Sequence, residues 1–103
     1  MYTHKVTIVR PDKTNPFFYH DLYNDGTYAL YSQKYKDEGR LISESMEESE
    51  DGLSLTRTLV FSDKASYEEM LTGWASQNPF YTKRFIQYVQ QVRHQVSFDA
   101  FES

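Results

Sequence analysis

Short segments in which apolar and polar residues alternate stand near both ends of the chain. Val6 and Ile8 share one face of residues 3–10, and Val96 and Phe98 alternate with polar residues near the C-terminus. A period of two residues is typical of a strand with one buried face. Each end of the chain is therefore predicted to be a β-strand.

Two further segments of this kind predict a β-hairpin in the middle of the chain. Residues 41–48 and 53–61 flank the sequence Asp51-Gly52, which favours a tight turn. Pairing across this turn predicts one apolar face, which consists of Ile42, Glu44, Met46, Glu48, Leu55, Arg57, Leu59 and Phe61.

Helical patterns occupy the two intervals between these strands. Asn15-Pro16 predicts a helix start, with Asn15 as the N-cap and Pro16 in the first helical position. Because of the turn residues at positions 24–26, we expect either two short helices or one broken helix in this interval, ending at Gly39.

The second interval holds a helix that is interrupted once. Ser62 or Asp63 is a candidate N-cap, and Ser66 with Glu69 fits a capping box slightly further along. Residues 78–79, Asn-Pro, end one apolar stripe and start another. The two stripes consist of Tyr67, Met70, Leu71 and Trp74, and of Phe85, Tyr88, Val89 and Val92.

The resulting order of elements, β-α-β-β-α-β, predicts a single α+β domain over residues 1–103. In this ferredoxin-like arrangement, helices cover one face of an antiparallel sheet. The other face would carry Val9, Val60 and Phe101 among serines and threonines, which makes it partly apolar. We therefore expect a homodimer that buries this face of the sheet.

Composition removes several classes of function. With 15 acidic and 11 basic residues, the net charge of −4 argues against general binding to nucleic acid. The absence of cysteine excludes disulfides and thiolate metal sites. No apolar run reaches the roughly 20 residues that a membrane helix needs, and the N-terminus lacks the pattern of a signal peptide. We expect a soluble, cytoplasmic protein that does not bind membranes.

The sequence contains no recognised catalytic motif and no metal-ligand motif. His4, His20 and His94 lie far apart and share no spacing typical of metal ligands. The acidic residues around the hairpin turn lack the ligand spacing of a calcium loop. We therefore predict no catalytic residue, no metal and no cofactor.

Arg57 is the polar residue of greatest interest, because strand alternation places it on the apolar face of the hairpin. A buried guanidinium keeps its charge, so it needs a carboxylate or an anionic ligand nearby. Glu44 is opposite or diagonal to Arg57 in either hairpin register, and Glu48 is a second candidate. Arg57 is thus either part of a structural ion pair or the anchor for an acid in a pocket.

Aromatic residues are frequent, with nine Tyr, seven Phe and one Trp. Tyr67, Trp74 and Tyr81 stand on either side of the break at residues 78–79. Such rings usually fill a core, but a kinked helix that carries them over a sheet can also wall a pocket for a small aromatic or acidic ligand. The candidate ligand-binding residues are Arg57, Tyr67, Trp74 and Tyr81.

The segment from Leu55 to Ser62, followed by residues 65–70, resembles the strand-then-helix segment of ferredoxin-like domains of the dimeric α+β barrel type. That group includes antibiotic-biosynthesis monooxygenases. The resemblance covers most of the chain as an order of elements. It implies homodimers whose sheets face each other and, in some members, cofactor-independent oxygenation of aromatic substrates. Residues 17–23 and 51–61 are also similar to small proteins of marine tailed phages.

Two classes of function remain. The first is a small non-catalytic binding or interaction protein, phage-encoded if the second resemblance holds, and the lack of a catalytic signature favours it. The second is a cofactor-independent monooxygenase-like enzyme or small-ligand carrier with a Tyr/Trp-lined pocket. The environment of Arg57 distinguishes them, because an ion pair with Glu44 removes the anchor of the pocket and an open cavity supplies it.

Overall fold

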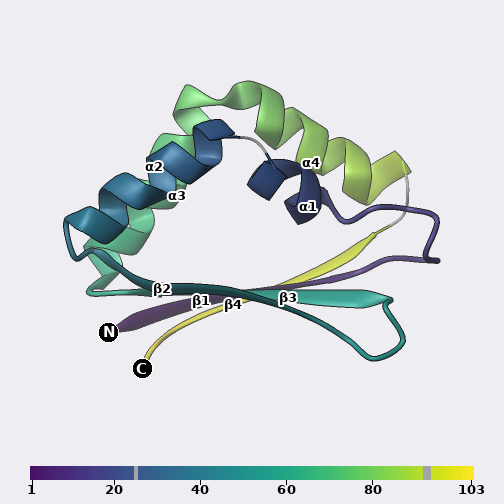
Figure 1. Ribbon diagram of the computed structural model, residues 1–103, viewed down its shortest axis with the longest axis horizontal. Helices are drawn as coiled ribbons and strands as arrows, with labels where there is room; N and C mark the ends of the chain where they lie inside the picture. Colours follow the sequence, from purple (N-terminus) through teal and green to yellow (C-terminus); the bar gives the residue numbers. More distant parts are fainter. Residues whose placement is uncertain (25, 92–93) are drawn as a thin grey trace.

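The computed structural model describes residues 1–24, 26–91 and 94–103. Four antiparallel strands form one sheet in the order β2-β3-β1-β4 (Figure 1). The strands are β1 (Tyr2–Val9), β2 (Leu41–Glu48), β3 (Ser54–Phe61) and β4 (Gln95–Glu102). The predicted α+β fold, with its antiparallel sheet, is confirmed.

The described helices lie on one face of this sheet, as Figure 1 shows. They are α1 (Phe18–Asn24), α2 (Gly26–Asp37), α3 (Lys64–Gln77) and α4 (Pro79–Gln91). The first helix is broken as predicted, although position 25 itself lies outside the described residues. The opposite face of the sheet carries none of the described helices.

The core lies between the two central strands and the helices. Side chains that face the helices alternate with side chains that face away, so that Val6, Ile8, Leu59 and Phe61 are each at most 1% exposed. Burying each of these apolar side chains contributes about 1.5–3 kcal/mol. The alternation predicted for both strands is therefore what holds the helices on the sheet.

The hairpin turn confirms the predicted pairing parity. Asp51 accepts hydrogen bonds on Oδ1 from the Leu53 amide (3.0 Å) and the Ser49 hydroxyl (2.6 Å), and Gly52 adopts a positive φ of 70°. Glycine takes this conformation without the steric cost that a side chain would bring. The resulting register places Met46 directly opposite Arg57, with Glu44 and Glu48 as the diagonal neighbours of Arg57.

The prediction that Ile42 belongs to the apolar face of the hairpin is wrong. The register shifts between Leu41 and Ser43, so that Leu41, which is 2% exposed, lies opposite Phe61 in the core. Ile42 is 52% exposed instead. A single extra residue in a strand reverses which side chains point inward on one side of the irregularity, and alternation alone does not reveal its position.

The predicted helix starts are partly correct. Asp63 caps α3 by accepting a hydrogen bond from the Ser66 amide (2.7 Å), and Pro79 begins α4 as predicted. The proposed capping box at Ser66 and Glu69 is wrong, because both side chains bond Arg40 instead. Val92, which was assigned to the last apolar stripe, lies outside the described residues.

The predicted start of the first helix at Asn15-Pro16 is also wrong, because α1 begins at Phe18. The Asn15 side chain donates to Asp12 Oδ1 (2.8 Å), and the backbone carbonyl of Asn15 accepts from Arg10 Nη1 (3.0 Å). These bonds hold the segment before α1 in a turn, so the Asn15 side chain is not available as a cap.

Candidate functional site

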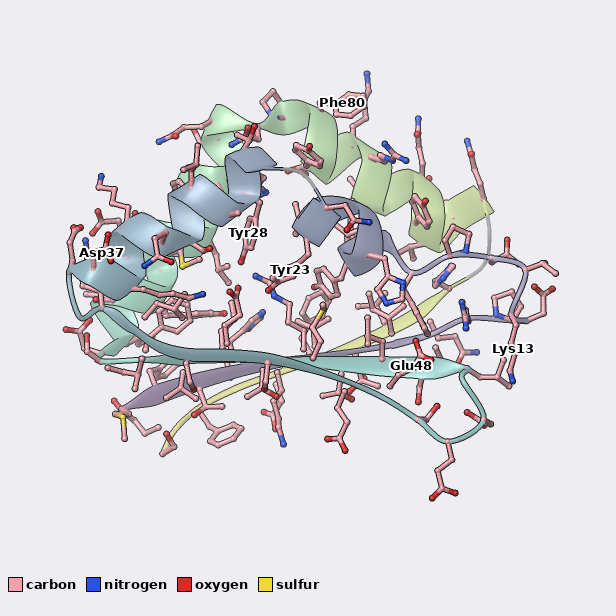
Figure 2. The ribbon with its side chains drawn as sticks, viewed as in Figure 1. Lys13, Tyr23, Tyr28, Asp37, Glu48 and Phe80 are labelled. Carbon is pink, nitrogen blue, oxygen red and sulfur yellow. The ribbon has the colours of Figure 1, made fainter. Side chains whose placement is uncertain are left out.

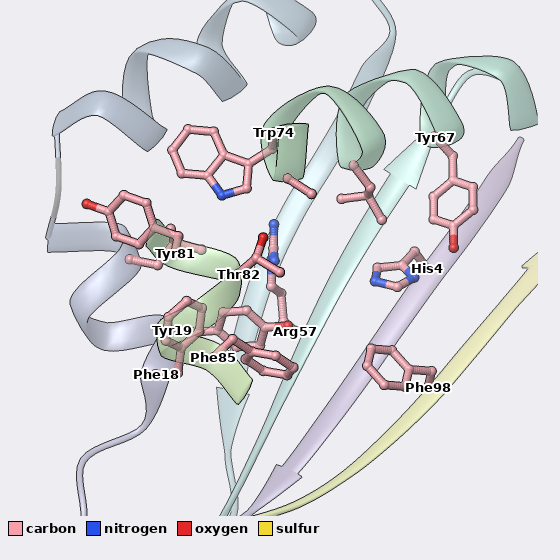
Figure 3. A pocket seen from close by; sticks show the side chains of 13 residues that line it. His4, Phe18, Tyr19, Arg57, Tyr67, Trp74, Tyr81, Thr82, Phe85 and Phe98 are labelled. Atoms are coloured by element: carbon pink, nitrogen blue, oxygen red, sulfur yellow. The ribbon is translucent and has the colours of Figure 1, made fainter. Parts of the chain in front are cut away.

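A cavity of about 360 Å³ lies between the sheet and helices α1, α3 and α4 (Figure 3). Its volume is at the small end of the range of ligand pockets, which is about 300–1,000 Å³. The walls are mainly aromatic and aliphatic, and among them stand a few polar side chains, including His4, Arg57 and Thr82. An apolar pocket with few polar groups is the usual form of a small-molecule site.

The structure brings the four predicted site residues together around this cavity. Arg57 reaches it from β3, Tyr67 and Trp74 from α3, and Tyr81 from α4 (Figure 3). The break before α4 turns the chain so that the rings of Trp74 and Tyr81 lie 5.5 Å apart, between centroids. That these residues bind a ligand stays a prediction.

Arg57 is only 5% exposed, and a group of polar side chains surrounds its guanidinium. Nη2 donates a hydrogen bond to the Tyr28 hydroxyl and lies 4.0 Å from Glu44 Oε2. The guanidinium carbon also lies over the rings of Tyr19, Tyr23 and Tyr28, at 4.8, 5.5 and 5.3 Å from their centroids. Such cation–π contacts are stronger where water is excluded.

Glu44 is the carboxylate that holds this group together. Its Oε2 accepts hydrogen bonds from Tyr23 (2.5 Å) and Tyr28 (3.0 Å), and Lys36 Nζ lies 3.1 Å from its Oε1. Figure 2 shows Tyr23 and Tyr28 in the layer between helices and sheet. We call Arg57, Glu44, Tyr23, Tyr28 and Lys36 the Arg57 cluster.

The charges of the Arg57 cluster follow from its contacts. Burial acts to raise the pKa of Glu44, but hydrogen bonds from Tyr23, Lys36 and Tyr28 outweigh it, so the pKa lies below its ordinary value. Burial raises the pKa of Tyr28 to about 12, against the effect of the Arg57 charge. Glu44 is therefore an anion and Tyr28 a neutral phenol at neutral pH.

Arg57 Nε takes no part in these hydrogen bonds. Nε is buried and has no hydrogen-bond partner within residues 1–24, 26–91 and 94–103. Arg57 therefore belongs to both of the situations that the sequence left open, because it neighbours Glu44 and also lines the cavity. Its link to Glu44 passes mainly through Tyr28 rather than through a direct bidentate pair.

His4 is a cavity residue that the sequence analysis did not assign to the site. It is 6% exposed, and its Nδ1 has no hydrogen-bond partner among the described residues. Burial, followed by the nearby Arg57 charge, lowers the pKa of His4 from 6.5 to about 4. The imidazole is thus neutral at pH 7. Strand alternation carried the missing signal, since His4 shares the inward face with Val6 and Ile8.

The other histidines lie away from the cavity. His20 Nε2 is on the surface, 3.9 Å from Glu48 Oε1, and His94 lies against the rings of Phe17 and Tyr88. In the described part of the chain, no three residues of the metal-binding types come together. None of the described helices is long and apolar enough to cross a membrane.

Comparison with known proteins shows similarity in structure but not in sequence. No protein-family model and no curated protein matches this chain. A dimeric ferredoxin-like protein from an uncultured marine organism matches 97% of this chain and 92% of its own, with 15% identity and a TM-score of 0.64. A candidate antibiotic biosynthesis monooxygenase from Deinococcus radiodurans matches 100% of this chain and 92% of its own, with 15% identity and a TM-score of 0.59.

A third solved structure is SnoaB, a cofactor-independent oxygenase from Streptomyces nogalater. It matches 99% of this chain and 91% of its own, with 10% identity and a TM-score of 0.57. At such low identity these similarities concern the fold and not the residues of the site. The chain therefore has the ferredoxin-like fold of these dimeric and monooxygenase-like proteins, as the order of its elements predicted.

Proposed function

We propose that this protein binds a small aromatic molecule in the cavity between the sheet and the helices. The observation that carries the proposal is Arg57, a buried cation that lines an aromatic-walled cavity and keeps one N–H without an acceptor. Buried polar groups in native structures nearly always have a partner. A ligand that fills the cavity would supply an acceptor for Arg57 and flat surfaces for the rings of Trp74 and Tyr81.

A carrier needs no further chemistry, so non-catalytic binding is the simplest form of this function. It narrows the wider class of non-catalytic binding or interaction proteins to one that holds a small molecule. We expect it to act as a homodimer through the outer sheet face, where Val9 and Phe101 are 38% and 39% exposed. The dimeric state of the similar marine protein supports this expectation.

The test of binding uses Trp74, which is the single tryptophan of the chain. Its indole N–H gives one resolved signal in a ¹⁵N-correlated NMR spectrum. We expect naphthalene-2-carboxamide or naphthalene-2-carboxylate to shift this signal in a saturable way. If neither compound shifts it at millimolar concentration, the proposed function is wrong.

A pair of variants shows whether the compounds enter the cavity. Thr82 lines the cavity from α4 and is exposed, so Thr82→Tyr narrows the cavity at a helix position that tolerates a larger side chain. Thr72 is also exposed, on α3, but does not line the cavity, and Thr72→Tyr is the matched control. Weaker binding is expected in the first variant only.

A second candidate is a cofactor-independent oxygenase, and the buried positive charge of Arg57 at the cavity favours it. A substrate that reacts with O₂ without a cofactor must first lose a proton and become electron-rich, and a fixed positive charge stabilises the resulting anion. We therefore expect 2-naphthol to cause protein-dependent oxygen uptake, measured with an oxygen electrode and abolished by Arg57→Gln. Binding without oxygen uptake would leave the carrier function and reject the enzyme.

A further inference from the structure

Two buried polar residues with unused nitrogens, His4 and Arg57, line the same cavity. The strand register pairs His4 with Leu59 and Val6 with Arg57, so His4 and Arg57 are diagonal neighbours on adjacent strands, both facing the helices. The α-carbons of such neighbours lie about 7–8 Å apart. One small ionised group can therefore bridge the two side chains through its hydrogen bonds. Figure 3 shows Arg57 extending from its strand toward Trp74 and Thr82, and His4 between Tyr67 and Phe98.

One nitrogen of each residue is buried and has no hydrogen-bond partner among the described residues. Arg57 Nε and His4 Nδ1 have no hydrogen-bond partner in the described part of the chain, although the two residues are only 5% and 6% exposed. Leaving a buried donor unpaired costs more than a hydrogen bond gains, and more still when the donor carries a charge. Both residues therefore line the cavity with their hydrogen-bonding capacity only partly used by the protein.

The charge of the Arg57 cluster sets the charge of this acceptor. Arg57 and Lys36 are two cations that share one carboxylate, Glu44, so one positive charge remains in the cluster. A group with a single negative charge balances it. A doubly charged phosphate would leave a negative charge in a largely apolar cavity, which is costly.

The fixed position of the guanidinium adds a geometric requirement. Nη2 is held by Tyr28, so the arginine cannot turn its whole fork toward a ligand. Its remaining N–H groups are the donors left for a ligand, while the neutral His4 imidazole can offer one N–H, on the nitrogen that its tautomer protonates. Two N–H groups on separate residues match the two oxygens of a planar carboxylate, which accepts on both.

From these observations we infer that the ligand is an aromatic carboxylate, whose two oxygens accept from the Arg57 guanidinium and the His4 imidazole while its ring lies against the aromatic wall that includes Trp74, Tyr81 and Tyr67. This inference rests on the proposed function, because it names the ligand class of the same cavity. It also assigns to His4 a direct role in binding, as the second donor to the acid.

The experiment compares naphthalene-2-carboxylate with naphthalene-2-carboxamide, which has the same size and shape but no charge. Dissociation constants at pH 7 come from the NMR shift of the Trp74 indole signal, with calorimetry as a second readout. We expect the carboxylate to bind about tenfold or more tightly than the amide, since a charge-assisted hydrogen bond is worth at least that factor.

Two variants test the residues separately. His4→Phe keeps a ring in contact with Tyr67 and removes the nitrogen, and it should reduce the preference for the carboxylate several-fold. Arg57→Gln removes the charge and should abolish the preference while amide binding persists. The amide also serves as the folding control for both variants, because its binding requires an intact cavity.

The possible results are distinct. A preference for the carboxylate that both variants lower supports the inference. Equal binding of the two compounds, or a preference that survives both substitutions, overturns it and leaves the proposed binding function intact. If neither compound binds, the proposed function fails, and the inference fails with it.

Discussion

His4 gives the fold a measurable dependence on pH. In the folded chain its pKa is about 4, against an ordinary value of 6.5, because burial and then the Arg57 charge disfavour the imidazolium. Between these two values the unfolded chain binds a proton that the folded chain does not. The contribution of His4 to stability is therefore fully present above pH 6.5 and is lost as the pH falls toward 4.

The size of this effect follows from the two pKa values. Each unit of pKa difference corresponds to about 1.4 kcal/mol, so His4 accounts for a loss of about 2 kcal/mol between pH 7 and pH 5. This is an upper value, because water in the cavity would partly solvate an imidazolium. The charged and titratable groups that face His4 are Arg57 from β3 and Tyr67 from α3, whereas Phe98 from β4 adds only a ring.

The assay is urea unfolding at pH 7, 6 and 5, followed by circular dichroism. We expect the unfolding free energy of His4→Phe to fall by about 2 kcal/mol less than that of the unchanged protein between pH 7 and pH 5. Burial also lowers the pKa of His94, but that residue is present in both proteins and its effect cancels.

A second variant, His4→Gln, separates titration from packing. Phenylalanine and glutamine differ in shape, so the two variants should differ in stability at pH 7. They should nevertheless show the same weakened dependence on pH, since neither titrates. Parallel curves for the unchanged protein and both variants would show that His4 is not held neutral, and the reasoning would then be refuted.

Five other substitutions, in three tests, probe the remaining structure by unfolding and by solution mass. Glu44→Gln leaves the Arg57 charge without its buried carboxylate and should lower the free energy of unfolding by about 3 kcal/mol. Glu47→Gln, at an exposed position of the same strand, should lower it by about 0.5 kcal/mol or less. Similar losses of stability in the two variants would contradict the role of the Arg57 cluster. Leu41→Ala should cost about 2–4 kcal/mol and Ile42→Ala much less, and the reverse order would contradict the strand irregularity. Val60→Lys places a charge on the outer sheet face and should give a monomer by light scattering at concentrations where the unchanged chain is a dimer. A monomer before substitution would reject the dimer.

Local rules predicted most of the fold. The Asp51-Gly52 turn sets whether odd or even positions pair across the hairpin, so the inward faces of both strands followed from it except at Leu41 and Ile42, beyond the strand irregularity. Asp63 and Pro79 could be predicted because a cap and a helix-starting proline act within a few residues. The prediction of a helix start from an N-cap residue followed by proline failed at Asn15, where hydrogen bonds with Asp12 and Arg10 hold the segment in a turn.

The site was predictable only where one strand or one stripe determined it. Alternation indicated that Arg57 faces the helices, and it would have indicated the same for His4. Tyr23 and Tyr28 could not be assigned to the Arg57 cluster, because their contacts depend on how two short helices lie over the sheet. A contact between residues 29 positions apart, such as Tyr28 and Arg57, leaves no periodic signal in the sequence.

The choice between an ion pair and a ligand anchor assumed that Arg57 could serve only one purpose. A guanidinium has five N–H donors, and a carboxylate reached from one side can use only part of them. In this structure Tyr28 stands between Arg57 and Glu44, so one edge of the guanidinium is fixed and Nε stays unpaired. The internal contacts would thus orient the arginine for a ligand, in the way that supporting hydrogen bonds orient the residues of a binding site.

If the Arg57 cluster orients Arg57 in this way, losing Glu44 should weaken carboxylate binding even though Glu44 carries the same charge as the ligand. A purely electrostatic account predicts the opposite, because removing a nearby negative charge would then strengthen binding. The affinity of Glu44→Gln for naphthalene-2-carboxylate therefore decides whether the cluster positions Arg57 or merely neutralises it.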